Sequence, residues 1–246
     1  MKFLIQKIDG KVQHDFSFTL LKSIEYFNWV NVNNDSKCSV KYLNCHYNGD
    51  FEFKEFHINY VPIGSVEFVL AFLNQFHCVK PKPINIPEEL FSYACRDIKN
   101  INHMDLENEI GKFFLKSNDK IKGLTEEIHL KVIGDIPKIP AGNYQLSELI
   151  DIESEWRCFV YMGELVGMQY YSGDFKMFPC VEDIENMIKA YKSAPVAYTL
   201  DIGIHDDRNF VIECHDFFSC GLYGFADHRI LPFMFYRWFK SYIKNI

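Results

Sequence analysis

The feature that most constrains the fold is the segment 81–87, which carries three prolines in seven residues. Proline fixes its own backbone angle, lacks an amide donor and restricts the residue before it, so neither a helix nor a central strand can run through this segment. The segment therefore predicts a linker, and we place a boundary near residue 85. Pro87 is followed by Glu88 and Glu89, a pattern typical of the start of a helix.

Composition limits the class of protein. A chain of 246 residues with 48% hydrophobic and 24% charged residues predicts a globular protein with a core, not a disordered one. The aromatic content of 16% means that many rings must be buried or bind a partner. The net charge of −7 argues against non-specific nucleic-acid binding and suits carboxylates that hold metal cations.

The sequence predicts a cytoplasmic protein that does not enter a membrane. No run approaches the roughly 18 apolar residues of a membrane span, and the N-terminal residues lack the pattern of a signal peptide. The eight cysteines include no C-x-x-C pair and are too sparse for a disulfide scaffold, so we expect free thiols. Three Cys–His neighbours suggest zinc, but their spacing favours incidental buried thiols instead. These neighbours are Cys45-His46, His77-Cys78 and Cys214-His215.

Apolar periodicity predicts intermixed strands and helices, which indicates the α+β (mixed α/β) class with several lobes. The predicted strands are 2–8, 51–56, 112–116, 144–150, 155–161, 165–171, 196–204 and 209–214. The predicted helices are 18–29, a helix capped by Ser65 that runs to about residue 73, 181–192 and 229–246. Aromatic residues of the last segment are expected to form core under the C-terminal helix.

Charged residues in the second half of the chain suggest a site for phosphate and a nucleotide. Lys116 ends an apolar strand and opens a polar loop that contains Lys120 and Lys122. A lysine ammonium suits phosphate oxygens, although most loop lysines are only solvated. Glu148 lies at an apolar strand edge, where a carboxylate and backbone groups can face an adenine or ribose. The alternative is an ordinary exposed Glu beside a strand, which is common.

Arg157 lies inside the predicted strand 155–161 between large apolar residues. Arginine is rarely buried without a partner, and its guanidinium fork suits a phosphate or a carboxylate. The alternative is a structural ion pair with Glu155 or another acid. Arg157 is therefore a candidate binding residue, with that alternative open.

Asp201 and Glu213 lie on two late strands joined by a polar turn. Such a hairpin can bring the two carboxylates side by side, where they repel each other unless a cation lies between them. Oxygen ligands favour Mg²⁺, which usually also takes oxygens from substrate phosphates. The alternative is a solvated acidic hairpin. His215 and Asp216 follow Glu213 after one intervening residue, Cys214.

The order of these parts resembles the ATP-grasp superfamily over roughly residues 90–246. The stretches 147–157 and 212–224, and 61–68 in the N-terminal part, look like a small stand-alone branch found in bacteria and phages. The resemblance implies two β-rich lobes that grip ATP, preceded by a small α/β lobe. The implied division is 1–85 for the N-terminal lobe and 86–246 for the ATP-grasp domain, with lobes 86–146 and 147–246.

The resemblance also implies roles for individual residues. Lys116 would contact the phosphates of ATP, with a second cation from the following loop, and Arg157 would stabilise the transferring phosphoryl group or an acyl-phosphate. Asp201 and Glu213 would ligate Mg²⁺. The second cation would be Lys120 or Lys122, and the adenine hinge would consist of Glu148, Leu149 and Ile150.

One position departs from the superfamily pattern. Two residues after the metal-binding Glu, the pattern usually has Asn, and this chain has His215. Imidazole is a poor ligand for Mg²⁺ and a better one for Mn²⁺ or Zn²⁺. Either Asp216 substitutes, or a second metal is weakly bound, or the metal preference differs.

The leading hypothesis is an ATP-dependent ligase that joins a carboxylate to an amine through an acyl-phosphate. Its substrates would be small molecules, amino acids or peptides, and residues 1–85 would help to bind the acceptor. The alternatives are a catalytically silent nucleotide-binding module, favoured by His215, and a factor that binds a host protein through exposed aromatic residues. The substrates and the oligomeric state are left open.

Overall fold

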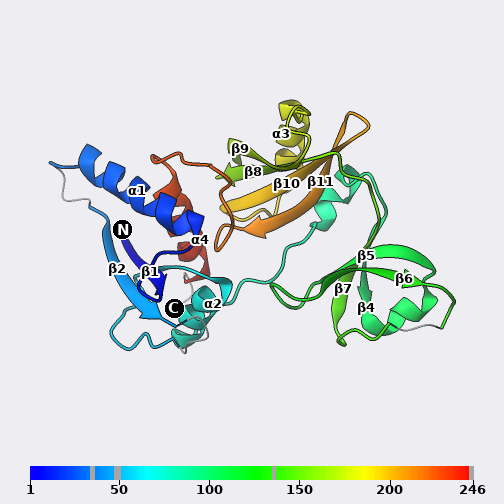
Figure 1. Cartoon of the computed structure of the whole chain (residues 1–246), viewed down its shortest axis with the longest axis horizontal. Helices are drawn as coiled ribbons and strands as arrows, with labels where there is room; N and C mark the ends of the chain where they lie inside the picture. Colours follow the sequence, from blue (N-terminus) through cyan, green and yellow to red (C-terminus); the bar gives the residue numbers. More distant parts are fainter. Residues whose placement is uncertain (34–36, 47–50, 135–136, 244–246) are drawn as a thin grey trace. The chain divides into compact units, whose positions relative to one another are not determined.

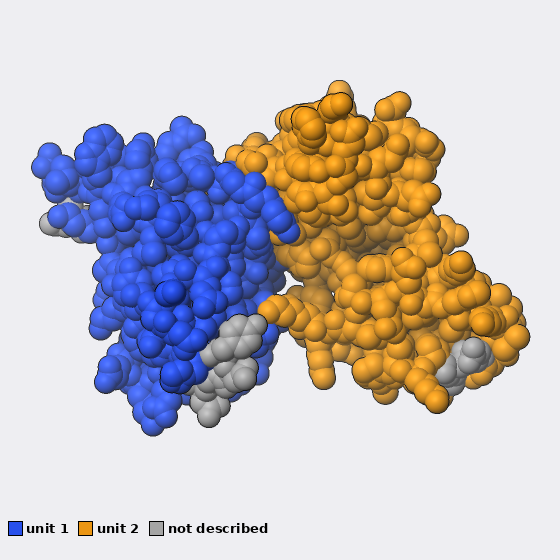
Figure 2. Space-filling view, viewed as in Figure 1, with its two compact units in different colours: residues 1–81, 195–197, 216–246 blue, residues 82–194, 198–215 orange. Residues whose placement is uncertain are grey.

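The computed structural model describes residues 1–33, 37–46, 51–134 and 137–243. The chain forms two compact units (Figures 1 and 2). Unit 1 comprises Met1–Pro81, Pro195–Ala197 and Asp216–Ile246, and unit 2 comprises Lys82–Ala194 and Tyr198–His215. The first passage between the units follows Pro81, inside the predicted linker. The lobe boundaries at residues 85 and 146 stay predictions.

Unit 1 is built on a three-stranded parallel sheet with the order β2-β1-β3. Its central strand is buried along most of its length, as expected where both faces of a parallel sheet are covered. The helix α1 forms the crossover between the first two strands, and α2 follows β3 (Figure 1). The elements are β1 (Lys2–Ile8), α1 (Asp15–Val30), β2 (Ser39–Cys45), β3 (Val61–Ile63), α2 (Val66–Gln75) and α4 (Leu231–Tyr242).

The C-terminal helix α4 belongs to unit 1 because its aromatic face packs there. Phe235 lies 6.5 Å from Phe16 of α1, and Phe239 lies 6.1 Å from Phe72 of α2, between ring centroids. The buried rings of α4 confirm the predicted core under this helix. Residues 244–246 of the predicted helix 229–246 lie outside the described residues. Among the described residues, no helix combines the length and apolar character needed to cross a bilayer.

One predicted strand in unit 1 is wrong. Residues 51–56 form no strand; instead Phe56 N donates to Phe53 O at 2.9 Å and closes a turn. The rings of Phe51 and Phe53 pack on Phe68 at 5.4 and 5.3 Å, so the aromatic spacing reflects packing against α2. Sequence reasoning missed β2, a largely exposed edge strand without clear alternation.

Unit 2 contains two four-stranded sheets, with the orders β4-β7-β5-β6 and β11-β10-β8-β9. Each sheet has its own buried apolar cluster, and α3 covers the second sheet (Figure 1). The strands are β4 (Ile98–Asn102), β5 (Gly111–Ser117), β6 (Thr125–Leu130), β7 (Asn143–Glu148), β8 (Ser154–Tyr161), β9 (Glu164–Gly173), β10 (Ala197–His205) and β11 (Arg208–Asp216). The helices are α3 (Val181–Ala190) and two 3₁₀ helices, Glu88–Tyr93 and His103–Asn108. The chain has the predicted α+β class.

The cap of α2 gives a test of this fold. The Ser65 hydroxyl accepts a hydrogen bond from Phe68 N at 3.2 Å, as the sequence predicts. We expect Ser65→Ala to lower the free energy of unfolding by about 1 kcal/mol in urea titrations, because the amide loses its acceptor. Ser39→Ala, at an exposed position on β2, is the matched control and should change stability by less than about 0.5 kcal/mol. Equal effects of the two substitutions would contradict the capping role.

Candidate functional site

The predicted charged residues lie on four strands of unit 2. Lys116 lies on β5 of the first sheet, and Arg157, Asp201 and Glu213 lie on β8, β10 and β11 of the second sheet. In the space-filling view, the surface of unit 2 is hollowed between its two halves (Figure 2). Residues from distant parts of the sequence therefore meet within one compact unit.

Helix α3 determines which face of the second sheet carries the charges. Cys158, Leu200 and Ile202 are fully buried in the apolar cluster that includes α3. Because successive side chains of a strand point to opposite faces, their neighbours Arg157 and Asp201 lie on the face away from α3. One face of the sheet therefore packs in the apolar core, and the opposite face carries the charged side chains of the candidate site.

Strand β11 departs from strict alternation, and this departure places Glu213. Val211 and Cys214 both belong to the cluster under α3, although residues three apart normally lie on opposite faces. The alternation therefore slips by one residue between them, as in a β-bulge. Glu213 reaches the face of Asp201, and the two residues have ligand atoms within 4.8 Å of each other.

Arg157 and Asp201 form a buried, two-pronged ion pair. The guanidinium Nε donates to Asp201 Oδ1 at 2.8 Å, and a terminal nitrogen donates to Oδ2 at 2.7 Å. Asp201 is 1% exposed and Arg157 is 8% exposed. A carboxylate in such a place needs a well-aligned cation to offset its loss of water. The sequence left open a pair with Glu155, but that carboxylate accepts from the Tyr171 hydroxyl at 2.8 Å instead.

Lys116 and Glu213 form the second pair, across the two sheets. The Lys116 ammonium contacts Glu213 Oε2, and the other carboxylate oxygen lies 2.7 Å from His215 Nε2. Burial lowers the pKa of Lys116 to about 8, because desolvation disfavours the ammonium; the negative charge of Asp201 acts in the opposite direction. An anionic ligand beside Lys116 would favour the charged form.

Asp201, Glu213 and His215 form a group that could hold a metal ion. Each offers one ligand atom, and these atoms lie within 4.8 Å of one another. Two carboxylates suit Mg²⁺ or Mn²⁺, and the imidazole shifts the preference toward Mn²⁺. The donor chemistry of the three side chains therefore fits a divalent cation.

Asp216, the predicted substitute ligand, has a different role in the structure. Its Oδ1 accepts from Trp238 Nε1 at 3.1 Å, and its Oδ2 accepts from the Tyr242 hydroxyl at 2.7 Å. Both oxygens thus hold α4 in unit 1. This placement gives no support to a metal-ligand role for Asp216.

The cysteine beside His215 lies in the core, apart from the group of Asp201, Glu213 and His215. Cys214 is fully buried in the cluster under α3, and burial raises the pKa of its thiol well above the usual range. Zinc binds the thiolate, so a thiol kept neutral is a poor ligand. All eight cysteines are free, as the sequence predicts.

Arg96 belongs to the same charge cluster, and sequence reasoning missed it. One guanidinium nitrogen donates to the carbonyl oxygens of Ala94 at 2.9 Å and Val211 at 3.1 Å. Burial lowers the pKa of Arg96 to about 10, and its positive charge contributes to the lowered pKa of Lys116. The only available signal was the rarity of buried arginine, and no predicted element surrounded this residue.

The predicted adenine hinge lies at the end of the first sheet. Glu148 is the last residue of β7, and Leu149 and Ile150 begin the link to β8. Glu148 Oε2 accepts from Asp97 N at 3.0 Å, and Glu148 N donates to Asp97 O at 3.0 Å. A cavity of about 260 Å³ adjoins these residues and is also lined by Phe113. Of the three predicted hinge residues, Glu148 lines this cavity.

The predicted second phosphate cation lies in the loop between β5 and β6. Lys120 and Lys122 are both exposed, and Lys122 adopts a left-handed backbone conformation with φ of 54°. The structure does not bring either lysine into the buried group around Lys116. Their contact with phosphates stays a prediction.

A family model described as ATP-grasp domain, R2K clade family 2, matches residues 93–232, more than half of the chain. The chain belongs to this ATP-grasp family. The matched range contains Lys116, Arg157, Asp201, Glu213 and His215, and the match confirms the resemblance found in the sequence. Membership places the protein, in general terms, with ATP-binding, ATP-dependent ligases.

Solved structures with some likeness to this chain include other ATP-grasp proteins. D-alanine–D-alanine ligase from Bacillus anthracis is 10% identical with a TM-score of 0.49, and all of each chain is covered. The RimK domain protein ATP-grasp from Sphaerobacter thermophilus is 9% identical with a TM-score of 0.49 at the same coverage. The macrocyclase MdnC from Microcystis aeruginosa, bound with precursor peptide MdnA, is 11% identical with a TM-score of 0.47, covering 95% of this chain and 99% of its own. At these scores they carry no argument about the site. No curated protein matches the sequence.

The buried pair can be tested with a double-mutant cycle. Arg157→Met leaves the Asp201 carboxylate buried without its cation, so we expect the free energy of unfolding to fall by about 3–5 kcal/mol. Asp201→Leu should be similarly costly. The double variant Arg157→Met/Asp201→Leu should cost clearly less than the sum of the two, because neither charge is left alone. Urea titrations measure all three, and additive effects would contradict a direct, buried pair.

Proposed function

We propose that the protein is an ATP-dependent ligase that joins a carboxylate to an amine through an acyl-phosphate. The observation that carries the proposal is the group of Lys116, Arg157, Asp201 and Glu213 in unit 2 of an ATP-grasp family member, in which Arg157 and Asp201 are buried and Lys116 and Glu213 are partly buried. Phosphoryl transfer depends on positioned cations around spreading negative charge more than on a protein nucleophile. The group supplies such cations together with acidic ligands.

Lys116 and Arg157 take the phosphate-directed roles in this proposal. The Lys116 ammonium would bind phosphate oxygens of ATP, and Arg157 would stabilise the transferring phosphoryl group and the acyl-phosphate. Arg157 presents a fixed guanidinium because Asp201 holds it at two points. Arg96 adds positive potential beside Lys116. Lys120 or Lys122 would supply a further cation from the exposed loop.

Asp201, Glu213 and His215 would hold the divalent cation, Mg²⁺ or Mn²⁺. When bound, the cation would neutralise charge on the phosphates. In the structure, the Asp201 carboxylate is paired with Arg157 and the Glu213 carboxylate is paired with Lys116. Binding of ATP would give Lys116 a new anionic partner and leave Glu213 available to the cation.

Glu148, Leu149 and Ile150 would bind the adenine at the end of β7. Glu148 is held beside the adjoining cavity by two hydrogen bonds to the Asp97 backbone, one through its carboxylate and one through its amide. Backbone groups of the link 149–150 would form hydrogen bonds with the edge of the adenine, and apolar side chains would pack against its face. The acceptor amine would reach the acyl-phosphate with help from residues 1–85, and amino acids or peptides are the proposed substrate class.

The role of Lys116 leads to a direct test of activity. Lys116→Ala should lower ADP formation at saturating Mg-ATP at least about 100-fold, because it removes a charge placed at the transferring phosphate. Lys112→Ala, at an exposed position on the same strand, is the matched control and should keep its activity. A coupled ADP assay with a panel of amines and carboxylates makes the measurement. Intact turnover in the folded Lys116→Ala variant would contradict the assignment.

The presence of His215 predicts an unusual metal preference. In His215→Asn, an amide oxygen replaces the imidazole nitrogen, so the ratio of activity in Mg²⁺ to activity in Mn²⁺ should rise. The control His129→Asn lies at an exposed position on β6 and should leave the ratio unchanged. A ratio that is equal in the native protein and His215→Asn would show that His215 does not bind the cation.

The second candidate is a nucleotide-binding module without turnover. The contact between His215 Nε2 and Glu213 at 2.7 Å favours it, because the imidazole competes with a cation for that carboxylate. Tight ATP binding without ADP formation over hours, across amines and acids in both Mg²⁺ and Mn²⁺, would support this module. ADP release that depends on a substrate pair would exclude it.

A further inference from the structure

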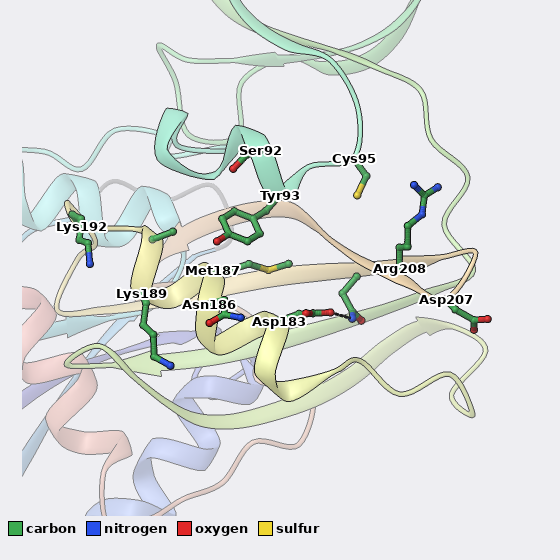
Figure 3. A pocket seen from close by; sticks show the side chains of 12 residues that line it. Ser92, Tyr93, Cys95, Asp183, Asn186, Met187, Lys189, Lys192, Asp207 and Arg208 are labelled. Carbon is green, nitrogen blue, oxygen red and sulfur yellow. Dashed lines mark hydrogen bonds between the residues drawn. The ribbon is translucent and has the colours of Figure 1, made fainter.

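Unit 2 carries a second pocket, of about 620 Å³, on the α3 side of the second sheet (Figure 3). Its walls come from the end of the 3₁₀ helix Glu88–Tyr93, from α3 and from the start of β11. Arg157 and Asp201 lie on the other face of the same sheet, and none of the proposed ATP-site residues lines this pocket. It is therefore a separate site.

The centre of the pocket is apolar and firmly packed. Figure 3 shows the ring of Tyr93 beside the side chain of Met187 in the middle of the pocket. Met187 is fully buried in the cluster under α3, and Tyr93 packs against the same cluster. Pockets of this size with an apolar floor and a few polar groups are typical of small-molecule sites.

The charged residues that line the pocket are three cations, Lys189, Lys192 and Arg208, and two carboxylates, Asp183 and Asp207. The Asp183 carboxylate, in the first turn of α3, accepts a hydrogen bond from Asn209 Nδ2 at 2.6 Å and keeps its negative charge. Asp207 points away from the centre in Figure 3. Arg208 forms no ion pair with any of the described residues, and Lys192 is exposed at the other end of the pocket. An anion would meet these cations without displacing an existing partner.

Cys95 connects the pocket wall to the backbone of the candidate site. It adopts a left-handed conformation with φ of 54°, which is rare for a residue with a Cβ, and its exposed side chain lines the pocket. The next residue, Arg96, turns toward the carbonyls of Ala94 and Val211 and adds charge beside Lys116. Strained backbone of this kind persists where the surrounding structure holds it in place.

We propose that this pocket binds a small organic anion with an apolar body. The body would lie against the ring of Tyr93, above the buried Met187, and the negative group would lie beside Arg208. The inference rests on the pocket alone and does not depend on the proposed ligase activity. A ligand there would contact Cys95 and thus the chain segment that positions Arg96.

The first test uses 1-anilinonaphthalene-8-sulfonate, which has an aromatic body and one fixed negative charge. Alkylation of the full-length protein by iodoacetamide is followed at each cysteine by mass spectrometry. Cys180, which is exposed but does not line the pocket, is the internal control. With probe at about ten times its dissociation constant, we expect alkylation of Cys95 to slow about tenfold by mass action, while that of Cys180 stays unchanged. Equal rates at Cys95 with and without probe would overturn the proposal.

A pair of arginine variants tests the anion contact. Arg208→Ala should raise the dissociation constant of the probe about tenfold in a fluorescence titration, because the anion loses its cation. Arg237→Ala makes the same charge change at an exposed position on α4 and should leave the constant unchanged. The titration is repeated with saturating Mg-ATP. Equal affinities of the two variants, or loss of Cys95 protection when Mg-ATP is added, would contradict a separate anion site.

Discussion

The candidate site depends on the balance of charge between Arg157 and Asp201. Both side chains are nearly inaccessible to water, so each is tolerated only because the other is aligned with it at two points. The second pair, Lys116 and Glu213, repeats the arrangement across the two sheets of unit 2. Two cations and two carboxylates are thus already in place, and under the proposed function a phosphate and a divalent cation would exchange with these partners.

The second sheet can hold Arg157, Asp201 and Glu213 because its two faces have different environments. Helix α3 covers one face and keeps the strands packed, so the opposite face can carry charge. The slip in alternation between Val211 and Cys214 then turns Glu213 toward Asp201 without exposing the core. This small irregularity in β11 places Glu213 within reach of Asp201 on β10, and the proposed cation site depends on that placement.

Much of the second sheet was predictable, since β8, β10 and β11 combine long apolar runs with isolated charges. The edge strands β2, β4 and β6 were not found because their exposed residues show little alternation. The spacing of Phe51 and Phe53 resembles that of a strand, but the segment forms a turn whose rings pack against α2. Arg96 and the true role of Asp216 depend on long-range packing, which local patterns do not encode. The family resemblance, in contrast, rested on motif order and was confirmed.

The charge group around Arg157 and Asp201 is proposed as a site for ATP with a divalent cation. Isothermal titration calorimetry of the full-length protein with ATP, with Mg²⁺ or Mn²⁺ and then with the metal chelated, tests it most directly. We expect one ATP bound per chain, with an affinity that falls sharply when the metal is removed. Absence of binding under all of these conditions, with the protein folded, would contradict it.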